Sequence, residues 1–253
     1  MSTLKLKAAS SGEVQLTVPS TIANQTIIFP AAAPTAGKAL KATNTSGTLE
    51  WGSIDIANLS ASGTASSSTF LRGDNTWATP TDNGKIIQVK QTRKKDTVTN
   101  SVAHSTWETL ELAGSITPAS ANNTIRVQMV ANVGQSSTHF SGYSIYREIN
   151  GGAAAQLTGY LGDADGNRTR TAQSTHHNPA NQDNQIILDY LDDISSWTSG
   201  AITYTLYGHH GEHAGAVTMY LNRGNYDNDH QQVSRPMSTV TLTEIASGGW
   251  SVA

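Results

Sequence analysis

Hydrophobic and polar residues alternate in short segments from about residue 82 to the end of the chain, as expected for half-buried β-strands. The clearest segment is 201–207, where Ile202, Tyr204 and Leu206 alternate with two threonines and a tyrosine. The pattern predicts strands at residues 85–91, 106–112, 124–133, 143–149, 156–161, 185–191, 201–207, 216–221 and 239–245, with a weaker candidate at 168–174. Turns rich in Gly, Asn and Asp separate them. About eight to ten antiparallel strands predict a two-sheet sandwich or jelly roll.

Residues 1–80 follow a different pattern, in which the apolar runs are too short to make a core. Residues 13–18 alternate as a strand should, and residues 25–29 form a second apolar run that Pro30 stops. Such a segment is either an ordered stalk built from several chains or a flexible linker. We expect the stalk, because regularly placed Leu, Ile and Trp would be wasted in a linker.

A weak repeat lies within this part. Residues 47–51 and 73–77 both read Gly-x-x-x-Trp, and each follows a leucine with a basic neighbour, Leu40 and Leu71. A tight turn at the glycine would fold the tryptophan back onto the preceding strand. Units this small cannot bury their apolar faces alone, so we expect them to stack or to trimerise. There is no heptad pattern, which excludes a coiled coil.

Composition also favours association between chains. Hydrophobic residues make up 37% of the 253 and charged residues 14%, while Gly occupies 22 positions. So little apolar surface does not offset a backbone ordering cost of roughly 1–2 kcal/mol per residue. Part of the chain is therefore expected to order by packing against other copies.

Charge and cysteine content exclude several classes of function. The net charge of −3 gives no strong steering toward nucleic acid or anionic membrane. The absence of cysteine excludes disulfides, thiolate metal sites and cysteine nucleophiles. No apolar run approaches the ~20 residues of a spanning helix, and no secretory signal is visible.

Residues 30–51 and 59–77 resemble the shaft segments of bacteriophage tail fibre proteins, and those of marine and T7-like phages are the most similar. The most specific element is Phe-Leu-Arg-Gly-Asp-x-x-Trp at residues 70–77. This resemblance covers residues 1–80. It implies a homotrimer that attaches to other virion proteins through its N-terminus.

The rest of the chain resembles the C-terminal head of the same fibres in scattered short blocks. The blocks are residues 84–89, 115–118, 162–170, 188–192, 218–223 and 238–245. The resemblance implies a trimeric β-sandwich head. We therefore expect an all-β protein in which a slender trimeric β shaft, the N-terminal attachment region 1–80, precedes an antiparallel, jelly-roll-like β-sandwich head, residues 81–253.

Histidines are the most conspicuous candidates for chemistry, and they are His176, His177, His209, His210, His213 and His230. His-His-x-x-His at 209–213 could bind a transition metal, and a trimer axis would turn one histidine into three ligands. No acidic residue has the spacing of a catalytic metal motif. We therefore expect solvated loop histidines and no metal.

Acidic residues give a weaker signal. The pairs Asp163/Asp165 and Asp192/Asp193 lie in loop-like sequence, where such pairs are usually solvated. Residues 163–167 resemble the opening of a calcium loop but lack the distal Glu. No nucleophile elbow, phosphate-binding loop or dinucleotide fingerprint occurs. We expect a protein that is not an enzyme and has no cofactor.

Strand direction decides which loops share an end of the head. With 168–174 counted as a strand, the loops far from the shaft are 92–106, 134–142, 162–167, 192–200 and 224–236, and histidines 176–213 lie at the shaft end. Without that strand, the later loops swap ends. We adopt the first arrangement. It nominates exposed residues of the distal loops as contacts, because aromatic and basic side chains in loops suit binding to a glycan or an anionic surface. The receptor-contact candidates are Arg93, Lys94, Lys95, His139, Trp197 and Tyr226.

These observations predict a virion protein, a homotrimeric tail fibre that mediates adsorption to a host-surface glycan or protein. Its other partners are virion proteins, and we expect neither nucleic-acid binding nor membrane insertion. A head (capsid) decoration fibre is the first alternative, because shaft-like sequence begins almost at once and no large tail-docking domain precedes it. The second is a glycan-degrading tailspike, which needs a cleft lined by carboxylates about 5–10 Å apart.

Overall fold

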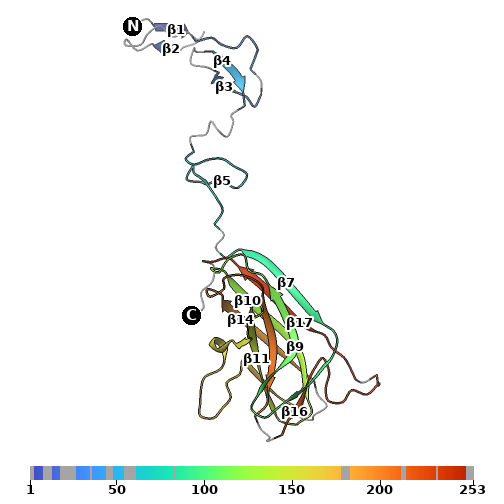
Figure 1. Ribbon diagram of the computed structural model, residues 1–253. Helices are drawn as coiled ribbons and strands as arrows, with labels where there is room; N and C mark the ends of the chain where they lie inside the picture. Colours follow the sequence, from blue (N-terminus) through green and yellow to red (C-terminus); the bar gives the residue numbers. More distant parts are fainter. Residues whose placement is uncertain are drawn as a thin grey trace. The chain divides into compact units, whose positions relative to one another are not determined.

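The computed structural model describes residues 3–7, 13–17, 27–34, 36–43, 48–53, 61–81, 84–177, 183–211, 215–231 and 233–248. The chain divides into two compact units, Met1–Thr81 and Asp82–Ala253 (Figure 1). The described residues contain strands, loops and one 3-10 turn, η2 (Thr158–Tyr160), so the predicted all-β class is confirmed. None of the described helical segments is long and apolar enough to cross a bilayer.

The first unit contains small antiparallel hairpins. They are β1 (Thr3–Lys7) with β2 (Glu13–Thr17), β3 (Ala39–Ala42) with β4 (Leu49–Gly52), and β5 (Phe70–Leu71) with β6 (Trp77–Ala78). Leu40 pairs with Trp51 in one hairpin and Leu71 with Trp77 in another. Each tryptophan therefore folds back onto the strand that carries the preceding leucine, as the repeat predicts. Gly47 lies outside the described residues.

The two leucine–tryptophan hairpins share a second feature, a backbone segment that bridges to them in parallel. Ile28 bridges to Thr48, and Ser62 bridges to Thr76. The Leu49 amide donates to the Ile28 carbonyl at 2.9 Å, and the Trp77 amide donates to the Ser62 carbonyl at 2.8 Å. The repeat is therefore present in the structure as well as in the amino-acid sequence.

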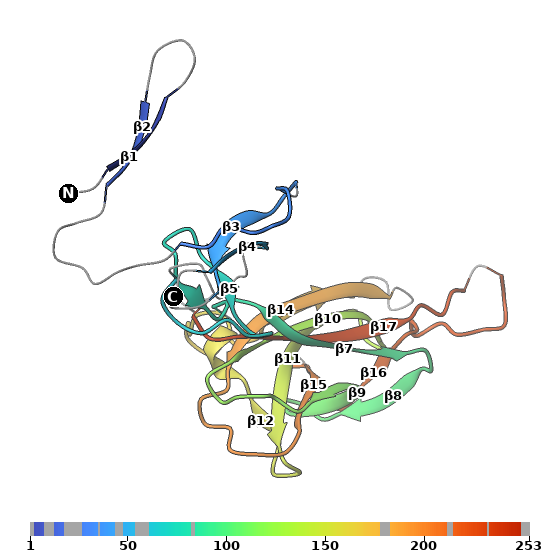
Figure 2. The same cartoon turned by 90° about the horizontal axis from the view of Figure 1, so that it is seen from above.

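The second unit is built from two antiparallel sheets. The six-stranded sheet contains β7 (Ile86–Lys94), β8 (Val98–Val102), β10 (Thr124–Gln135), β14 (Asn184–Asp193), β16 (Val217–Leu221) and β17 (Ser238–Ile245). The five-stranded sheet contains β9 (Trp107–Ile116), β11 (Phe140–Ile149), β12 (Ala155–Gln156), β13 (Gln173–His176) and β15 (Ile202–His209). Figure 2 shows β14, β10, β17 and β7 in one layer and β11, β15 and β9 in the other.

One hydrophobic core lies between the two sheets. Along β15, Ile202, Tyr204 and Leu206 are fully buried, while the residues between them are only half-buried. Facing strands contribute in the same way, with Met129 from β10 and Val240 from β17 inaccessible to solvent. Alternation places one side of each strand in the core and leaves the other side for the outer surface.

Two predicted strands differ from those observed. Residues 156–161 do not form a strand beyond Gln156, because the chain turns into η2, where Tyr160 and the preceding Leu157 both pack on the core. The weak candidate at 168–174 begins later, as β13. The short strand β8 was not predicted.

The false strand at 156–161 also inverts the predicted ends of later loops. We define the proximal end of the sheets as that where β7 begins, and the distal end as that where β7 ends. The pairing of neighbouring strands places the β14–β15 loop, residues 194–201, at the proximal end. It places His209 and the start of β11 at the distal end. Two predictions are therefore wrong: that loop 192–200 is distal, and that the histidines between 176 and 213 lie at the proximal (shaft) end.

A buried ion pair lies between the sheets at the proximal end. Arg147 Nη1 donates to both carboxylate oxygens of Asp192 at 2.9 Å, and the Tyr204 hydroxyl donates to Asp192 Oδ2 at 2.7 Å. Burial raises the pKa of Asp192 above its ordinary value, although the Tyr204 and Arg147 hydrogen bonds oppose the shift. The expectation that Asp192 is solvated is wrong.

Replacing Arg147 by methionine leaves the Asp192 carboxylate buried without its cation. We expect the free energy of unfolding, measured with urea, to fall by about 3–5 kcal/mol. The matched control is Arg126→Met, which breaks an exposed pair with Asp189 and should cost at most about 1 kcal/mol. Equal losses in the two variants would contradict the assignment.

Candidate functional site

Aromatic side chains gather on the outer face of the five-stranded sheet. Trp107 pairs with His209 across neighbouring strands, with ring centroids 5.0 Å apart. Tyr146 stacks on Tyr207 at 3.9 Å and also approaches Trp107. These residues alternate with the buried ones on β11 and β15, so the packing of the core turns the aromatic row outward.

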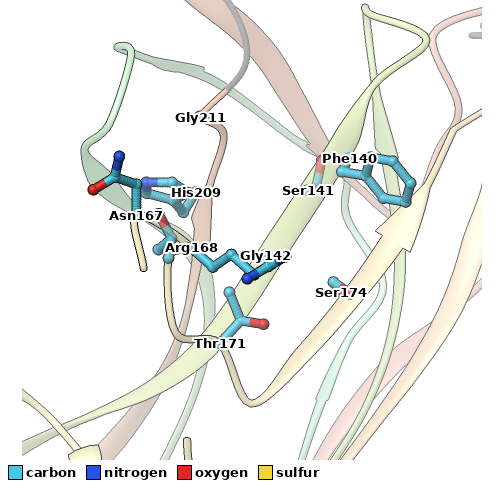
Figure 3. A pocket seen from close by; sticks show the side chains of 10 residues that line it. Phe140, Ser141, Gly142, Asn167, Arg168, Thr171, Ser174, His209 and Gly211 are labelled. Atoms are coloured by element: carbon cyan, nitrogen blue, oxygen red, sulfur yellow. The ribbon is translucent and has the colours of Figure 1, made fainter. Parts of the chain in front are cut away.

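A pocket of about 610 Å³ opens at the distal end of this face (Figure 3). Its lining comes from the starts of β11 and β13, the end of β15 and the loop that precedes β13. The lining residues are Phe140, Ser141, Gly142, Asn167, Arg168, Thr169, Thr171, Ser174, His209 and Gly211.

The loop that forms one wall of the pocket is tied down at both ends. The Gly162 amide donates to the Thr171 carbonyl at 3.1 Å, and Arg170 Nε donates to the Gly162 carbonyl at 2.6 Å. Thr171 lies directly over Gly142, and a Cβ at position 142 would clash with the Thr171 methyl group. The absence of a side chain at Gly142 therefore lets the loop rest on the sheet.

The charges near the pocket are largely neutralised within the loop. Arg168 Nη1 forms an ion pair with Asp165, and both side chains are exposed. On the opposite wall, burial and the neighbouring His210 and His104 lower the pKa of His209. The imidazole of His209 is therefore neutral at pH 7 and offers a hydrogen-bonding nitrogen without a charge.

Several histidines depart from the prediction that they are solvated. His177, His209 and His210 are buried. His177 Nε2 shares a hydrogen bond with the Thr175 hydroxyl at 2.9 Å, and His210 Nε2 donates to the Val102 carbonyl at 2.8 Å. Their role in the described structure is packing and hydrogen bonding within the distal end.

Metal ligation is not supported by the arrangement of these side chains. Among the residues that the structure describes, no three or more His, Asp or Glu side chains are placed to hold one ion. His213 lies outside the described residues.

The six predicted contact residues are not gathered in one place. Arg93 and Lys95 are exposed at the distal end of β7, and His139 is half-buried in the β10–β11 loop. Tyr226 is 49% exposed in the segment between β16 and β17, which extends away from both sheets in Figures 1 and 2. None of the six lines the distal pocket.

Two of the six are not exposed as expected. The Lys94 ammonium lies 2.8 Å from Asp96 and 3.6 Å from Glu111, and its side chain is only 16% exposed. Trp197 packs against the core and donates its indole N–H to the Gly200 carbonyl at 2.9 Å, at the proximal end.

Comparison with known proteins identifies no family. Neither a scan against protein-family models nor a search of the curated proteins found a match. Among solved structures, a chain in the structure of the infectious bursal disease virus Gx strain is 14% identical to this one, with a TM-score of 0.35. The match covers 68% of this chain and 40% of that chain. The VP2 subviral particle of the same virus is 13% identical with a TM-score of 0.33, covering 68% and 41%. The chain thus spans about two fifths of those chains, and likenesses this distant establish neither family nor function.

Acid should destabilise the protein partly through His209. Because folding lowers the pKa of His209, the unfolded chain binds the proton more readily below about pH 6.5. The contribution of neutral His209 to the free energy of unfolding is fully present above that pH and is lost as the pH falls through the pKa of His209 in the folded protein. We expect a smaller decline of unfolding free energy between about pH 7 and 5 in His209→Gln than in the parent, measured by urea titration. Parallel declines would contradict this.

Adding a methyl group at position 142 should lift the loop from the sheet. Gly142→Ala clashes with Thr171, so we expect a loss of about 1–3 kcal/mol in unfolding free energy and faster tryptic cleavage after Arg168 and Arg170. Gly215→Ala, where a Cβ meets nothing within 4 Å, is the control. Unchanged cleavage in Gly142→Ala would disprove the anchoring role.

Proposed function

We propose that this chain is a structural protein of a phage virion, a homotrimeric tail fibre whose second unit contacts the host surface. The observation that carries the proposal is a contrast between the two units. Both units expose some large apolar side chains, but the second also encloses a core, whereas no side chain described in the first is buried.

The first unit supplies the evidence for association. Ile27, Ile28 and Phe29 are 62%, 51% and 64% exposed, and Phe70 and Leu71 are also exposed. Each fully buried side chain of this size contributes about 1.5–3 kcal/mol relative to an exposed one. Repeating units of this size gain that burial from neighbours, so three copies that wrap together account for the exposed residues.

The second unit supplies the evidence for a head. Apart from the short strands β8, β12 and β16, its eight strands are ordered β7-β17-β10-β14 and β9-β15-β11-β13. Counted along the chain, these orders are first-eighth-third-sixth and second-seventh-fourth-fifth. That order supports a double-sheet jelly roll, an architecture used by viral capsid and lectin domains.

Contact with the host is assigned to the distal end of this unit. The distal pocket, the exposed Arg93 and Lys95, and the extended segment with Tyr226 all lie on loops or strand ends there. Loops on a rigid sheet scaffold are the usual place for recognition residues. A location on the virion follows from this role.

The oligomeric state tests the first half of the proposal. We expect sedimentation of the full chain to give three times the 26.7 kDa chain mass. Replacing Ile28 and Phe29 with serine should shift the equilibrium toward monomer, whereas Tyr226→Ser, which removes an exposed ring from the second unit, should leave the trimer intact. A compact monomer of the parent chain would reject the fibre.

Particle labelling tests the second half. An antibody against the first unit should mark the tail of purified phage, and added protein should slow adsorption of those particles to their host. Label on the capsid would favour a head decoration fibre instead, and release of reducing sugar from host polysaccharide would favour a tailspike.

A further inference from the structure

We propose that the distal pocket binds one or two rings of a neutral saccharide. This deepens the proposed function, because it names the chemical class that the distal end would contact on a host surface. The inference rests on four properties of the pocket: its aromatic walls, its uncharged polar groups, its charge balance and its anchored loop.

Aromatic residues line the pocket at both walls, with an exposed phenylalanine at one and a largely buried histidine at the other. Phe140 begins β11 and is 59% exposed at one wall, where its ring lies 4.6 Å from that of His176. The opposite wall includes the edge of His209, which is 5% exposed and whose ring is tilted against that of Trp107. The C–H-rich face of a sugar ring packs against such rings, while its hydroxyls remain at the edge to form hydrogen bonds.

Uncharged polar groups complete the lining. Asn167 offers both an amide donor and a carbonyl acceptor, and Thr169 and Ser174 offer hydroxyls that donate and accept. Figure 3 shows Asn167 beside His209 and Ser174 toward the Phe140 side. This mixture matches the alternating donors and acceptors of a polyol ring.

Charge balance selects a neutral ring over an acidic one. Arg168 crosses the pocket toward Gly142 in Figure 3, but Asp165 neutralises it. Arg170 is turned to the carbonyls of Gly162 and Leu161. Because its pKa is lowered, the His209 imidazole adds no positive charge at neutral pH. An anionic sugar would therefore meet no uncompensated cation in the pocket.

Size and rigidity suit the same ligand. The volume of about 610 Å³ lies in the range of about 300–1,000 Å³ that small-ligand sites occupy. The loop is held by the Gly162–Thr171 hydrogen bond and by the contact of Thr171 over Gly142. A pocket that is already formed loses little conformational freedom on binding.

Affinity electrophoresis of the full chain tests the proposal. Native gels would contain dextran, mannan or galactan as neutral probes, and polygalacturonate as an anionic probe, and a glycan array would extend the neutral set. We expect retardation by at least one neutral polysaccharide, quenching or shift of tryptophan fluorescence through Trp107, and no retardation by polygalacturonate.

Variants assign the binding to this pocket. Phe140→Ala removes an exposed aromatic wall and Asn167→Ala an exposed amide, and each should weaken binding about tenfold or more. Val89→Ala, which trims an exposed side chain in the middle of β7 and outside the pocket, should bind as the parent does. Circular dichroism and melting temperature verify that each variant is folded.

Each outcome has a defined consequence. Parent-like binding by both pocket variants, preference for polygalacturonate, or no binding across the neutral array overturns the saccharide assignment. Sedimentation of the same preparation separates this from the proposed function. If the protein is a trimer that blocks adsorption through a protease-sensitive host component but binds no saccharide, the fibre proposal is kept and the saccharide site is rejected. If it is a monomer that binds saccharide, the saccharide site is kept and the fibre proposal is rejected.

Discussion

Burial of alternate side chains between two sheets is the constraint on which the second unit depends. Residues such as Met129, Leu206 and Val240 are inaccessible to solvent because each strand turns one side toward the facing sheet. The same alternation directs Trp107 and Tyr207 to the outer surface. A shift of one residue in register would exchange these two sets, so the core that stabilises the unit also positions the aromatic row and the pocket beside it.

Polar residues inside the core reinforce this arrangement. Asp192 is held by Arg147 and Tyr204, and Glu244 accepts hydrogen bonds from the Ala119 amide at 2.7 Å and from Asn123 at 2.6 Å. At the proximal end, Asp192 joins one sheet to the other, and Glu244 joins the β9–β10 loop to β17. A buried charge needs such partners because its desolvation is costly. These contacts hold the two sheets and one loop together at the proximal end, while the distal end carries the pocket.

The first unit depends on a different balance. Its hairpins satisfy backbone hydrogen bonds, with Leu40 opposite Trp51 and Leu71 opposite Trp77. Phe70 on one hairpin, and Ile28 and Phe29 in the segment that bridges to the other, nevertheless stay exposed. Local pairing thus defines the repeat but encloses no interior. In the proposed fibre the missing interior comes from other copies, which also explains why a chain with 37% hydrophobic residues contains such exposed apolar groups.

Most strands, the all-β class and the leucine–tryptophan repeat followed from the sequence alone, because alternation and turn residues are local signals. The direction of the later strands did not. Residues 156–161 have a strand-like pattern, but Leu157 and Tyr160 pack on the core at and just before a 3-10 turn. That one difference moves loop 194–201 and the loop after His209 to ends opposite to those predicted. The pocket and the burial of His209 were equally invisible. They arise where Phe140 and His209, on neighbouring strands, meet Asn167 from the loop before β13, and only tertiary packing decides which distant residues become neighbours.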